Sequence, residues 1–284
     1  MTTVKRINRN FLASTKSILV AAALGGILTS CAMSPSGRPQ LDLVSDEKIN
    51  ELGAASFQKM KDQGSISRNS KVNDYVNCVA DAMLVQLGDF GKEWEIVVFN
   101  ARSANAFAVP GRKIGVHTGI LALTENQDQL AAVIGHEIAH VVSKHANERM
   151  SAKYATSIPL NIAAFIYGNT YAGNQAIALL GMGSQVGLLL PFSRKHESEA
   201  DELGMDMMAW AGFNPLETVK LWKNMAQEAK DAEARSGGKA KKPPEFLSTH
   251  PAEDTRVKGL VSRMGGALKL YNQAQKEGRN PKCG

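Results

Sequence analysis

The sequence predicts an α+β fold that is mostly helical, with a small β-sheet beside one central helix. Two patterns indicate this class. Apolar residues recur with the helical period along most of the chain, whereas strand-like runs and a hairpin turn are confined to residues 95–117. The 284 residues are 44% hydrophobic and 21% charged, which is enough for one sizeable core.

Residues 1–30 have the pattern of a lipoprotein signal peptide. A positive segment, Lys5–Lys16, precedes an apolar run at residues 18–28 that is too short to span a membrane comfortably. The four residues Leu-Thr-Ser-Cys that end at Cys31 resemble a bacterial lipobox, so we expect cleavage before Cys31 and lipid on its thiol. Ala32 follows in place of Asp, which favours sorting to the outer membrane. The alternative is an ordinary secretory peptide that happens to contain a cysteine.

The rest of the chain divides into a short tether and one domain. Residues 31–44 begin with a stretch rich in Pro, Ser and Gly, which predicts a flexible, lipid-anchored tether before a globular domain at residues 45–284. The expected elements are helices at 45–63 and 70–87, a strand at 95–100, a hairpin of strands 107–109 and 113–117 around Pro110-Gly111, and helices at 125–149, 151–167, 174–188, 194–210, 215–234, 251–263 and 266–277.

Residues 154–193 contain no charged side chain, yet they do not predict a membrane hairpin. Polar residues and glycines interrupt every apolar run before it reaches the roughly 18–20 residues that a span requires. We expect helices that cover the central helix, either as a lid over a cleft or simply as core.

The decisive motif is His136-Glu137-Ile138-Ala139-His140, an HExxH sequence within the expected helix 125–149, for which Thr124 is a suitable N-cap. Histidines four residues apart lie about 40° apart around a helix, so both imidazoles project from one face. At this spacing they can hold one Zn²⁺, and Glu137 can take a proton from metal-bound water. An amphipathic helix with two surface histidines is the alternative.

The third ligand is expected in a later acidic run. Catalytic zinc needs three protein ligands and one open position, and Glu197 and Asp201 share a helix face. We expect Glu197 to bind the metal and Asp201 to hold the far nitrogen of a ligand histidine, while Glu199 points about 200° away. A solvated acidic helix face is the alternative. Two further histidines, His145 and His196, lie about 140° and about 100° around their helices from the nearest metal ligand, so we expect them to face away.

Together these motifs resemble the zincin peptidase family that includes HtpX, the CAAX prenyl protease and the periplasmic proteases BepA and LoiP. The resemblance is greatest to the soluble periplasmic lipoprotein members, LoiP and BepA, without the repeat domain that some of them append. It implies a zinc endopeptidase with one Zn²⁺ per chain. The matching segments are 135–140 and 193–201, and more weakly 105–116 and 248–251 with Arg256.

The resemblance also places His250 near the metal. This histidine can serve as a catalytic group that donates to the oxyanion, or it can occupy the open zinc position until substrate displaces it. A loop histidine without either role is the third option. Arg256 is expected to pair with an active-site carboxylate, with an exposed helix arginine as the alternative.

The three cysteines suggest one disulfide. If Cys31 carries lipid, Cys78 and Cys283 remain, in a compartment that permits disulfides. A bridge between them would tie the C-terminal tail to the second helix and stabilise the fold by about 2–5 kcal/mol. The alternative is a buried Cys78 and a free Cys283.

The expected function is a zinc-dependent endopeptidase that cleaves unfolded or misassembled proteins at the periplasmic face of the bacterial outer membrane. We expect the substrate to lie extended along strand 113–117, and the lipid anchor and the outer-membrane assembly machinery to be further partners. The alternative is a metal-stabilised chaperone or scaffold of outer-membrane assembly with little turnover. A nucleic-acid partner is not indicated, because residues 1–30 hold four of the 33 basic residues and no acidic one, so the rest is nearly neutral.

Overall fold

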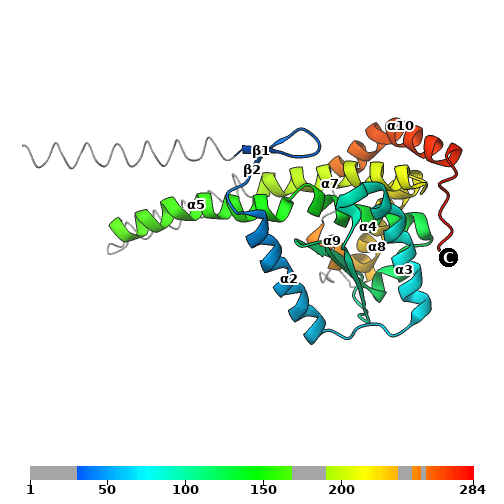
Figure 1. The fold of residues 1–284 in the computed structure, drawn as a ribbon, viewed down its shortest axis with the longest axis horizontal. Helices are drawn as coiled ribbons and strands as arrows, with labels where there is room; N and C mark the ends of the chain where they lie inside the picture. The colour runs from blue at the N-terminus through cyan, green and yellow to red at the C-terminus, as the bar shows by residue number, and fades with distance from the viewer. Residues whose placement is uncertain (1–30, 168–189, 236–244, 251–253) are drawn as a thin grey trace, which may run out of the picture.

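The long helix α4 (Gln127–Val142) runs through the centre of the fold, between a small sheet and a layer of other helices (Figure 1). Every residue of α4 from Gln129 to His140 is buried, so the helix that carries the HExxH motif is itself part of the core. The predicted fold class, mostly helical α+β, is confirmed. The structure is a computed structural model, and it describes residues 31–167, 190–235, 245–250 and 254–284.

The described part of the chain forms strands, α-helices and two 3-10 segments. In order, they are β1 (Cys31–Met33), β2 (Pro39–Leu41), α2 (Asp46–Gln63), α3 (Ser70–Leu84), the 3-10 segment η1 (Val85–Gly91), β3 (Glu95–Phe99), β4 (Ala106–Val109), β5 (Lys113–His117), the 3-10 segment η2 (Thr118–Ala122), α4, α5 (His145–Tyr167), α7 (Leu190–Ala211), α8 (Leu216–Arg235), α9 (Glu245–Thr249) and α10 (Asp254–Lys276).

Side-chain caps fix the starts of the first three of these helices. Ser45, Asn69 and Asn126 each accept a hydrogen bond from the backbone N–H three residues further on. The predicted cap Thr124 is therefore two residues early; its hydroxyl donates instead to the carbonyl of Ile120, within the preceding turn.

The mixed sheet has the strand order β3-β5-β4, in which β3 is parallel and β4 antiparallel to β5. The hairpin predicted around Pro110-Gly111 is present, and Gly111 takes the left-handed φ of 87° that glycine readily adopts. Because β5 is paired along both edges, the prediction that a substrate would pair with strand 113–117 is wrong. Among the described residues, β4 is an edge strand whose unpaired side faces α4.

The helices α4 and α7 pack with their backbones in contact. A Cβ atom at Gly135 would lie 2.9 Å from the carbonyl oxygen of Gly204, and one at Gly204 would lie 2.7 Å from the backbone nitrogen of His136. Two glycines at the crossing thus bring the HExxH turn of α4 directly against the turn of α7 that follows the acidic run.

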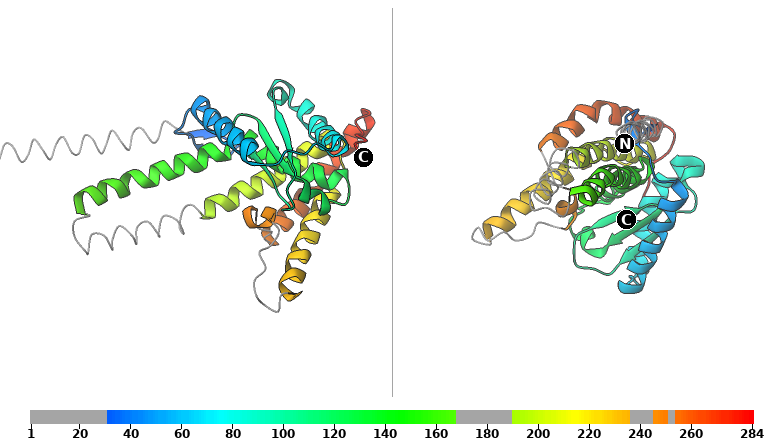
Figure 2. Two further views of the ribbon diagram at one scale, coloured as in Figure 1. Left: turned by 90° about the horizontal axis from the view of Figure 1, so that it is seen from below. Right: turned by 90° about the vertical axis from the view of Figure 1, so that its left-hand side faces the viewer.

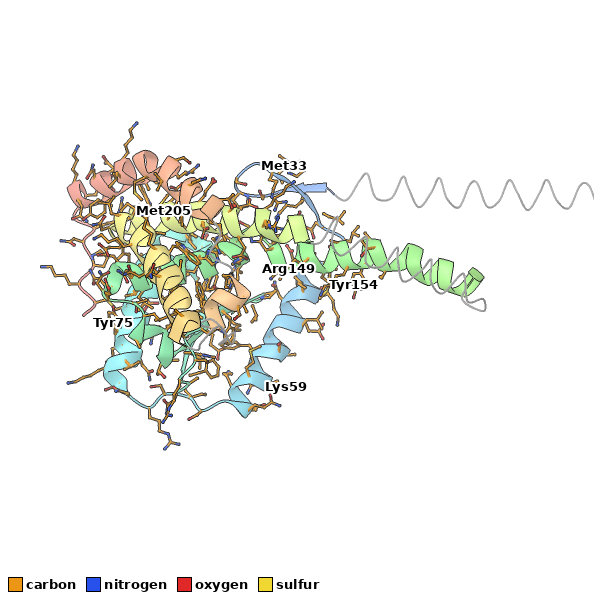
Figure 3. The ribbon with its side chains drawn as sticks, turned by 180° about the vertical axis from the view of Figure 1, so that it is seen from behind. Met33, Lys59, Tyr75, Arg149, Tyr154 and Met205 are labelled. Carbon is orange, nitrogen blue, oxygen red and sulfur yellow. A yellow bond between two sulfur atoms is a disulfide. The ribbon has the colours of Figure 1, made fainter. Side chains whose placement is uncertain are left out.

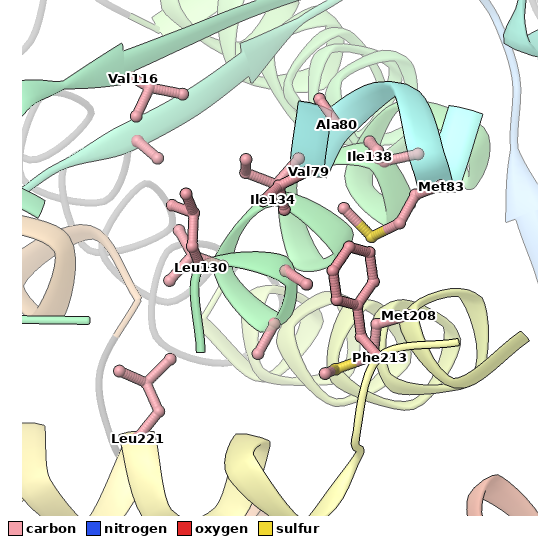
Figure 4. Packing of buried hydrophobic residues seen from close by; sticks show 14 of the residues in the cluster. Val79, Ala80, Met83, Val116, Leu130, Ile134, Ile138, Met208, Phe213 and Leu221 are labelled. Atoms are coloured by element: carbon pink, nitrogen blue, oxygen red, sulfur yellow. The ribbon is translucent and has the colours of Figure 1, made fainter. Parts of the chain in front are cut away.

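The main hydrophobic cluster surrounds this helix pair. It takes Leu130, Ile134 and Ile138 from α4, and side chains of α3, β5, α7 and α8 pack around them (Figure 4). Phe213, just beyond α7, is fully buried in the same cluster.

An N-terminal hairpin replaces the predicted flexible tether. β1 and β2 pair in antiparallel fashion, and the chain that follows them is fixed to α5 by a hydrogen bond of 2.8 Å from the backbone N–H of Leu43 to Oγ of Ser151. Arg38, in the turn, forms ion pairs with Glu148 and Glu199. These long-range polar contacts are the physical reason for the difference, since composition reports only local chain flexibility.

Two helix boundaries differ from the prediction. The expected helix 125–149 breaks after Val142, where Lys144 takes a left-handed φ of 51° and α5 starts at His145. The two expected C-terminal helices are one helix, α10, which continues through Gly265 and its exposed neighbour.

Beyond the break, α5 extends away from the other helices (Figures 1 and 2). In the parts of the chain that the structure describes, no helix combines the length and the apolar character needed to cross a membrane. The predicted signal peptide at 1–30 and the predicted helix 174–188 lie outside the described residues, as does most of the segment considered as a lid.

Candidate metal centre and active site

Four side chains converge at the crossing of α4 and α7. His136 and His140 come from α4, Glu197 comes from α7, and His250 follows α9 directly; one donor atom from each lies within 4.8 Å of the others, and all four residues are buried. The Nε2 atoms of His136 and His140 are 3.0 Å apart. The three metal ligands predicted from the sequence are thus brought together, and His250 joins them.

The donor atoms are spaced as a zinc ion requires. Zinc–nitrogen bonds of about 2.1 Å in a tetrahedral site place neighbouring donors about 3.4 Å apart. Here Nε2 of His136 lies 3.3 Å from Oε2 of Glu197 and 3.1 Å from Nδ1 of His250, and Nε2 of His140 lies 3.5 Å from Oε1 of Glu197. The residues present therefore fit a zinc ion, with His250 in the position of a fourth ligand.

The Glu197 carboxylate has the charge that a metal ligand needs. Burial alone would raise its pKa, but hydrogen bonds with His136 and His250 bring the pKa well below the ordinary value. Glu197 therefore stays ionised throughout the physiological range.

Asp201 and Arg256 lie behind His136. Oδ1 of Asp201 is 3.0 Å from Nδ1 of His136, and Arg256 donates to both Asp201 oxygens at 2.6 and 2.7 Å. Although burial would raise the pKa of Asp201, the bonds from Arg256 and His136 lower it. An ionised carboxylate at Nδ1 keeps the proton on that nitrogen and leaves Nε2 of His136 for the metal. Arg256 also stacks over Trp222, with 4.1 Å between its guanidinium carbon and the ring centroid.

Glu137 is buried beside the donors, with 3% of its surface exposed. Its Oε2 accepts a hydrogen bond of 2.9 Å from the backbone N–H of Ala108 in β4, and its Oε1 lies 3.4 Å from Nε2 of His250. Burial raises the pKa of Glu137 above its ordinary value, which suits a group that must both accept and release a proton.

Two cavities adjoin the donors and β4. One, of about 240 Å³, is lined by Glu137, His250 and residues of β4; the other, of about 210 Å³, lies between α2, the β4–β5 turn and the start of α5. Ala108, His140 and Arg149 line both, and Figure 3 shows Arg149 at the base of α5. Together the cavities form a cleft that runs along the open edge of β4.

A second polar layer, which the sequence did not predict, lies behind His140. Nδ1 of His140 is 2.8 Å from Nδ1 of His145, and Nε2 of His145 is 3.1 Å from Oε2 of Glu199. Burial lowers the pKa of His145 to about 4, so its ring is neutral. The ring of His196 stacks on that of His145, with centroids 4.3 Å apart.

The expectation that His145, His196 and Glu199 face away from the site is therefore wrong in part. None of them is among the metal donors, but all three are buried close behind them. The helix break after Val142 is the reason, because it folds His145 back against His140 instead of carrying it around the same helix.

Cys78 and Cys283 form a disulfide that joins α3 to the C-terminal tail across 205 residues of sequence. The tail is also held by Gln127, at the start of α4, whose side chain donates to the carbonyl of Pro281 at 2.8 Å. The bridge therefore fixes the chain end near the opposite end of α4 from the metal donors. The side chain of Cys31 lies outside the described part of the chain.

Comparison with known proteins adds the family. A family model described as peptidase family M48 matches residues 68–264, a range that contains the HExxH motif, the acidic run and His250. The chain belongs to peptidase family M48. This assignment agrees with the resemblance of the motifs to a family of zinc peptidases. His136, His140 and Glu197 are the metal-binding group.

Its curated relatives come from two settings. The peptidase is 37% identical to the mitochondrial metalloendopeptidase OMA1 of Schizosaccharomyces pombe over 186 residues, which are 66% of this chain and 51% of that protein. It is 20% identical to the beta-barrel assembly-enhancing protease of Escherichia coli over 283 residues, or 96% of this chain and 56% of that protein. The M48 chain spans about half the length of these relatives. The mitochondrial protein has the higher identity, although the motifs most resembled the periplasmic members.

Proposed function

We propose that this chain is a zinc-dependent endopeptidase that cleaves unfolded or misassembled proteins. The observation that carries the proposal is the open edge of β4 beside Glu137 and the metal donors. In an antiparallel strand alternate residues point their backbone groups to the same side. Because the N–H of Ala108 reaches Glu137, the backbone groups of Ala106 and Ala108 face the cleft.

This geometry selects extended chains. A substrate that adds a strand to β4 satisfies its own backbone groups there, and such pairing reads little of the amino-acid sequence. A folded protein rarely offers an unpaired extended segment, whereas an unfolded or misassembled one does. The two cavities along β4 leave room for the substrate to continue past the metal donors, as internal cleavage requires.

Each residue of the site has a separate role in peptide-bond hydrolysis. Bound zinc would supply a Lewis acid that polarises the scissile carbonyl and acidifies a water molecule. Glu137 takes the proton from that water and passes it to the leaving amine. Asp201 holds the ring of His136, and Ala108 can exchange its hydrogen bond with Glu137 for one with a substrate carbonyl.

Replacing Glu137 by glutamine tests the peptidase chemistry. We expect Glu137→Gln to retain one zinc ion per chain but to lose casein cleavage by a factor of about 10²–10⁴, the usual contribution of a general acid–base group. The same assay with a disulfide-bonded protein before and after reduction tests the substrate class, and only the unfolded form should be cut. Equal cleavage of both forms, or full activity of Glu137→Gln, contradicts the proposal.

We further propose that lipid on Cys31 holds the enzyme at the periplasmic face of the bacterial outer membrane. The lipobox-like sequence supports this, and so does the similarity to the beta-barrel assembly-enhancing protease of E. coli, which makes assembly machinery a candidate partner. Because β1 begins at Cys31, a lipid there would keep the catalytic body close to the membrane. Incorporation of labelled palmitate that Cys31→Ser abolishes is the expected result; unchanged labelling would contradict it.

A metal-stabilised chaperone or scaffold is the second candidate, because Nδ1 of His250 completes a four-donor set. A site closed in this way has no position for water. Suppression of aggregation of an unfolded protein that Glu137→Gln leaves intact, together with negligible cleavage by the wild type, would favour this role.

A further inference from the structure

We propose that Arg38, in the turn of the N-terminal hairpin, is a positioning residue for the metal ligand His140, and that it acts through Glu199 and His145. The hairpin lies beside the start of α5 and the beginning of α7 (Figure 1), and it precedes the HExxH motif by about a hundred residues of sequence. Its contact with the metal centre is a chain of three hydrogen bonds, each with one acceptor and one donor.

The first links assign the protons. Nε of Arg38 donates to Oε2 of Glu199 at 2.9 Å. Paired with Arg38, the Glu199 carboxylate accepts, so Nε2 of His145, at 3.1 Å, donates to it. On the other side, His140 presents Nε2 to the other donors and therefore carries its own proton on Nδ1, which faces Nδ1 of His145. The other ring nitrogen of His145, Nδ1, is therefore an acceptor.

The last link reaches the ligand. Because Nδ1 of His145 accepts, the proton in its 2.8 Å contact with Nδ1 of His140 must belong to His140. With Nδ1 protonated, His140 presents the lone pair of Nε2, which is the nitrogen that faces the other donors. The relay thus selects the tautomer of His140 and fixes the plane of its ring.

Arg38 is the cation that holds this arrangement. Its guanidinium forms two hydrogen bonds, of 2.8 and 2.6 Å, to the two oxygens of Glu148 and also lies 2.8 Å from Glu199. Side-chain exposure is 1% for Glu148 and 5% for Glu199. Two carboxylates buried side by side need a cation between them. Ser36 donates to Oε1 of Glu199, but Arg38 is the cation that bonds Oε2, the oxygen that faces His145.

In His136, the other histidine of the motif, a carboxylate contacts the ligand ring directly, without an intervening histidine. His136 is faced directly by Asp201, and Arg256 holds Asp201 with two hydrogen bonds. His140 has the same carboxylate–arginine support, with the ring of His145 inserted between ligand and carboxylate. Each ligand imidazole is therefore backed by one carboxylate and one arginine.

The test measures zinc affinity, by competition with a chromogenic chelator on the full chain. We expect Arg38→Ala to weaken zinc binding at least about tenfold, as loss of an outer-shell partner commonly does. Arg38→Lys keeps the charge but can bond one carboxylate at a time, so it should recover part of the affinity. Glu199→Gln offers an amide donor to His145, reverses the relay and should weaken binding at least as much.

Two controls separate positioning from docking of the hairpin. Ser151→Ala removes the bond to Leu43 without touching the relay, so it should lower the melting temperature and leave zinc affinity unchanged. In the double variant Arg38→Ala/Glu199→Gln, affinity should fall no further than in Glu199→Gln alone. The proposal is overturned if Arg38→Ala binds zinc within twofold of the wild type, if Ser151→Ala weakens it equally, or if the two losses simply multiply. Should Arg38→Ala not fold, Arg38→Lys and Glu199→Gln decide the same question.

Discussion

At the scale of single residues, the centre depends on which ring nitrogen of each histidine carries a proton. Asp201 decides this for His136 at a distance of 3.0 Å, and His145 decides it for His140 at 2.8 Å. In both cases the group that decides is buried, so water does not compete for the nitrogen. The far nitrogen of His250, Nε2, faces the Glu137 carboxylate at the longer distance of 3.4 Å.

Replacing His250 by alanine should raise turnover. Nδ1 of His250 lies 3.1 Å from Nε2 of His136 and 2.7 Å from Oε2 of Glu197, so the ring is within the donor set rather than set back from it as an oxyanion donor would be. We expect His250→Ala to cleave casein several-fold faster than the wild type, because the position for water is then open, and to bind zinc about tenfold more weakly. Initial rates at saturating zinc measure the first effect, and chelator competition measures the second.

The opposite outcome would assign His250 the other role. Loss of cleavage at unchanged zinc affinity would make it an oxyanion donor. His250→Gln is a useful companion variant, since an amide can still donate to an oxyanion but is a poor zinc ligand.

Residue spacing predicted the group behind His136, which is Asp201, but not the group behind His140, which is His145. Glu197 and Asp201 are four apart on one helix, and helical geometry alone puts them on the same face. His145 is five residues after His140, and the same geometry pointed it elsewhere because nothing in the sequence, neither glycine nor proline, marked the helix end at Lys144. That residue adopts its left-handed φ while its amine forms an ion pair with Asp46 at 2.6 Å, a contact across nearly a hundred residues.

At the scale of elements, the N-terminal hairpin should come away from α5 and α7 in acid. Burial alone would raise the pKa of Glu148 above its ordinary value of 4.5, but hydrogen bonds from Arg38 and His196 lower it to about 2. The pKa of Glu148 is thus lower in the folded state than in the unfolded state. The stabilisation of the fold by ionised Glu148 is therefore fully present above pH about 4.5 and is lost as the pH falls towards 2.

The free energy of unfolding of the metal-free protein, measured by urea titration between pH 6 and 2, checks this prediction. We expect a decline below pH about 4.5 that is shallower in Glu148→Gln, which has no carboxyl group to titrate. Glu51→Gln, which removes an exposed carboxylate from α2, is the control and should follow the wild type. Parallel curves for wild type and Glu148→Gln would contradict the assignment.

Elements were predictable where their signal is local. The hairpin of β4 and β5 follows from Pro110-Gly111 between apolar runs, and α2 from its capping serine and first-turn acids. The order of strands was not predictable, because β3 joins β5 in parallel through a non-local pairing. The N-terminal hairpin was not predicted for a related reason. It is held by Arg38, whose partners Glu148 and Glu199 lie on two helices that are distant in sequence.

At the scale of the whole molecule, the Cys78–Cys283 disulfide should stabilise the fold without affecting the site. It closes a loop of 205 residues, and a crosslink of that span removes much of the entropy of the unfolded chain, worth about 2–5 kcal/mol. We expect Cys78→Ser to lower the free energy of unfolding by this amount and to leave zinc affinity unchanged. Urea unfolding of the oxidised wild type and the variant measures the difference.

Reduction of the wild type provides the matched comparison. The reduced protein should unfold at the same urea concentration as Cys78→Ser, and reduction should not change the variant. A variant as stable as the oxidised wild type would mean that the C-terminal tail, which Gln127 also holds, needs no covalent link.

The contact of Gly135 with Gly204 limits how this protein can vary. Since a single added methyl group at either position would collide with the opposite main chain, neither helix can shift relative to the other without parting along its length. The contact between the two glycines consequently fixes the distance from the two imidazoles on α4 to the Glu197 carboxylate on α7. An alanine at Gly135 or Gly204 would therefore push α4 and α7 apart and increase the distance between the two imidazoles and the Glu197 carboxylate.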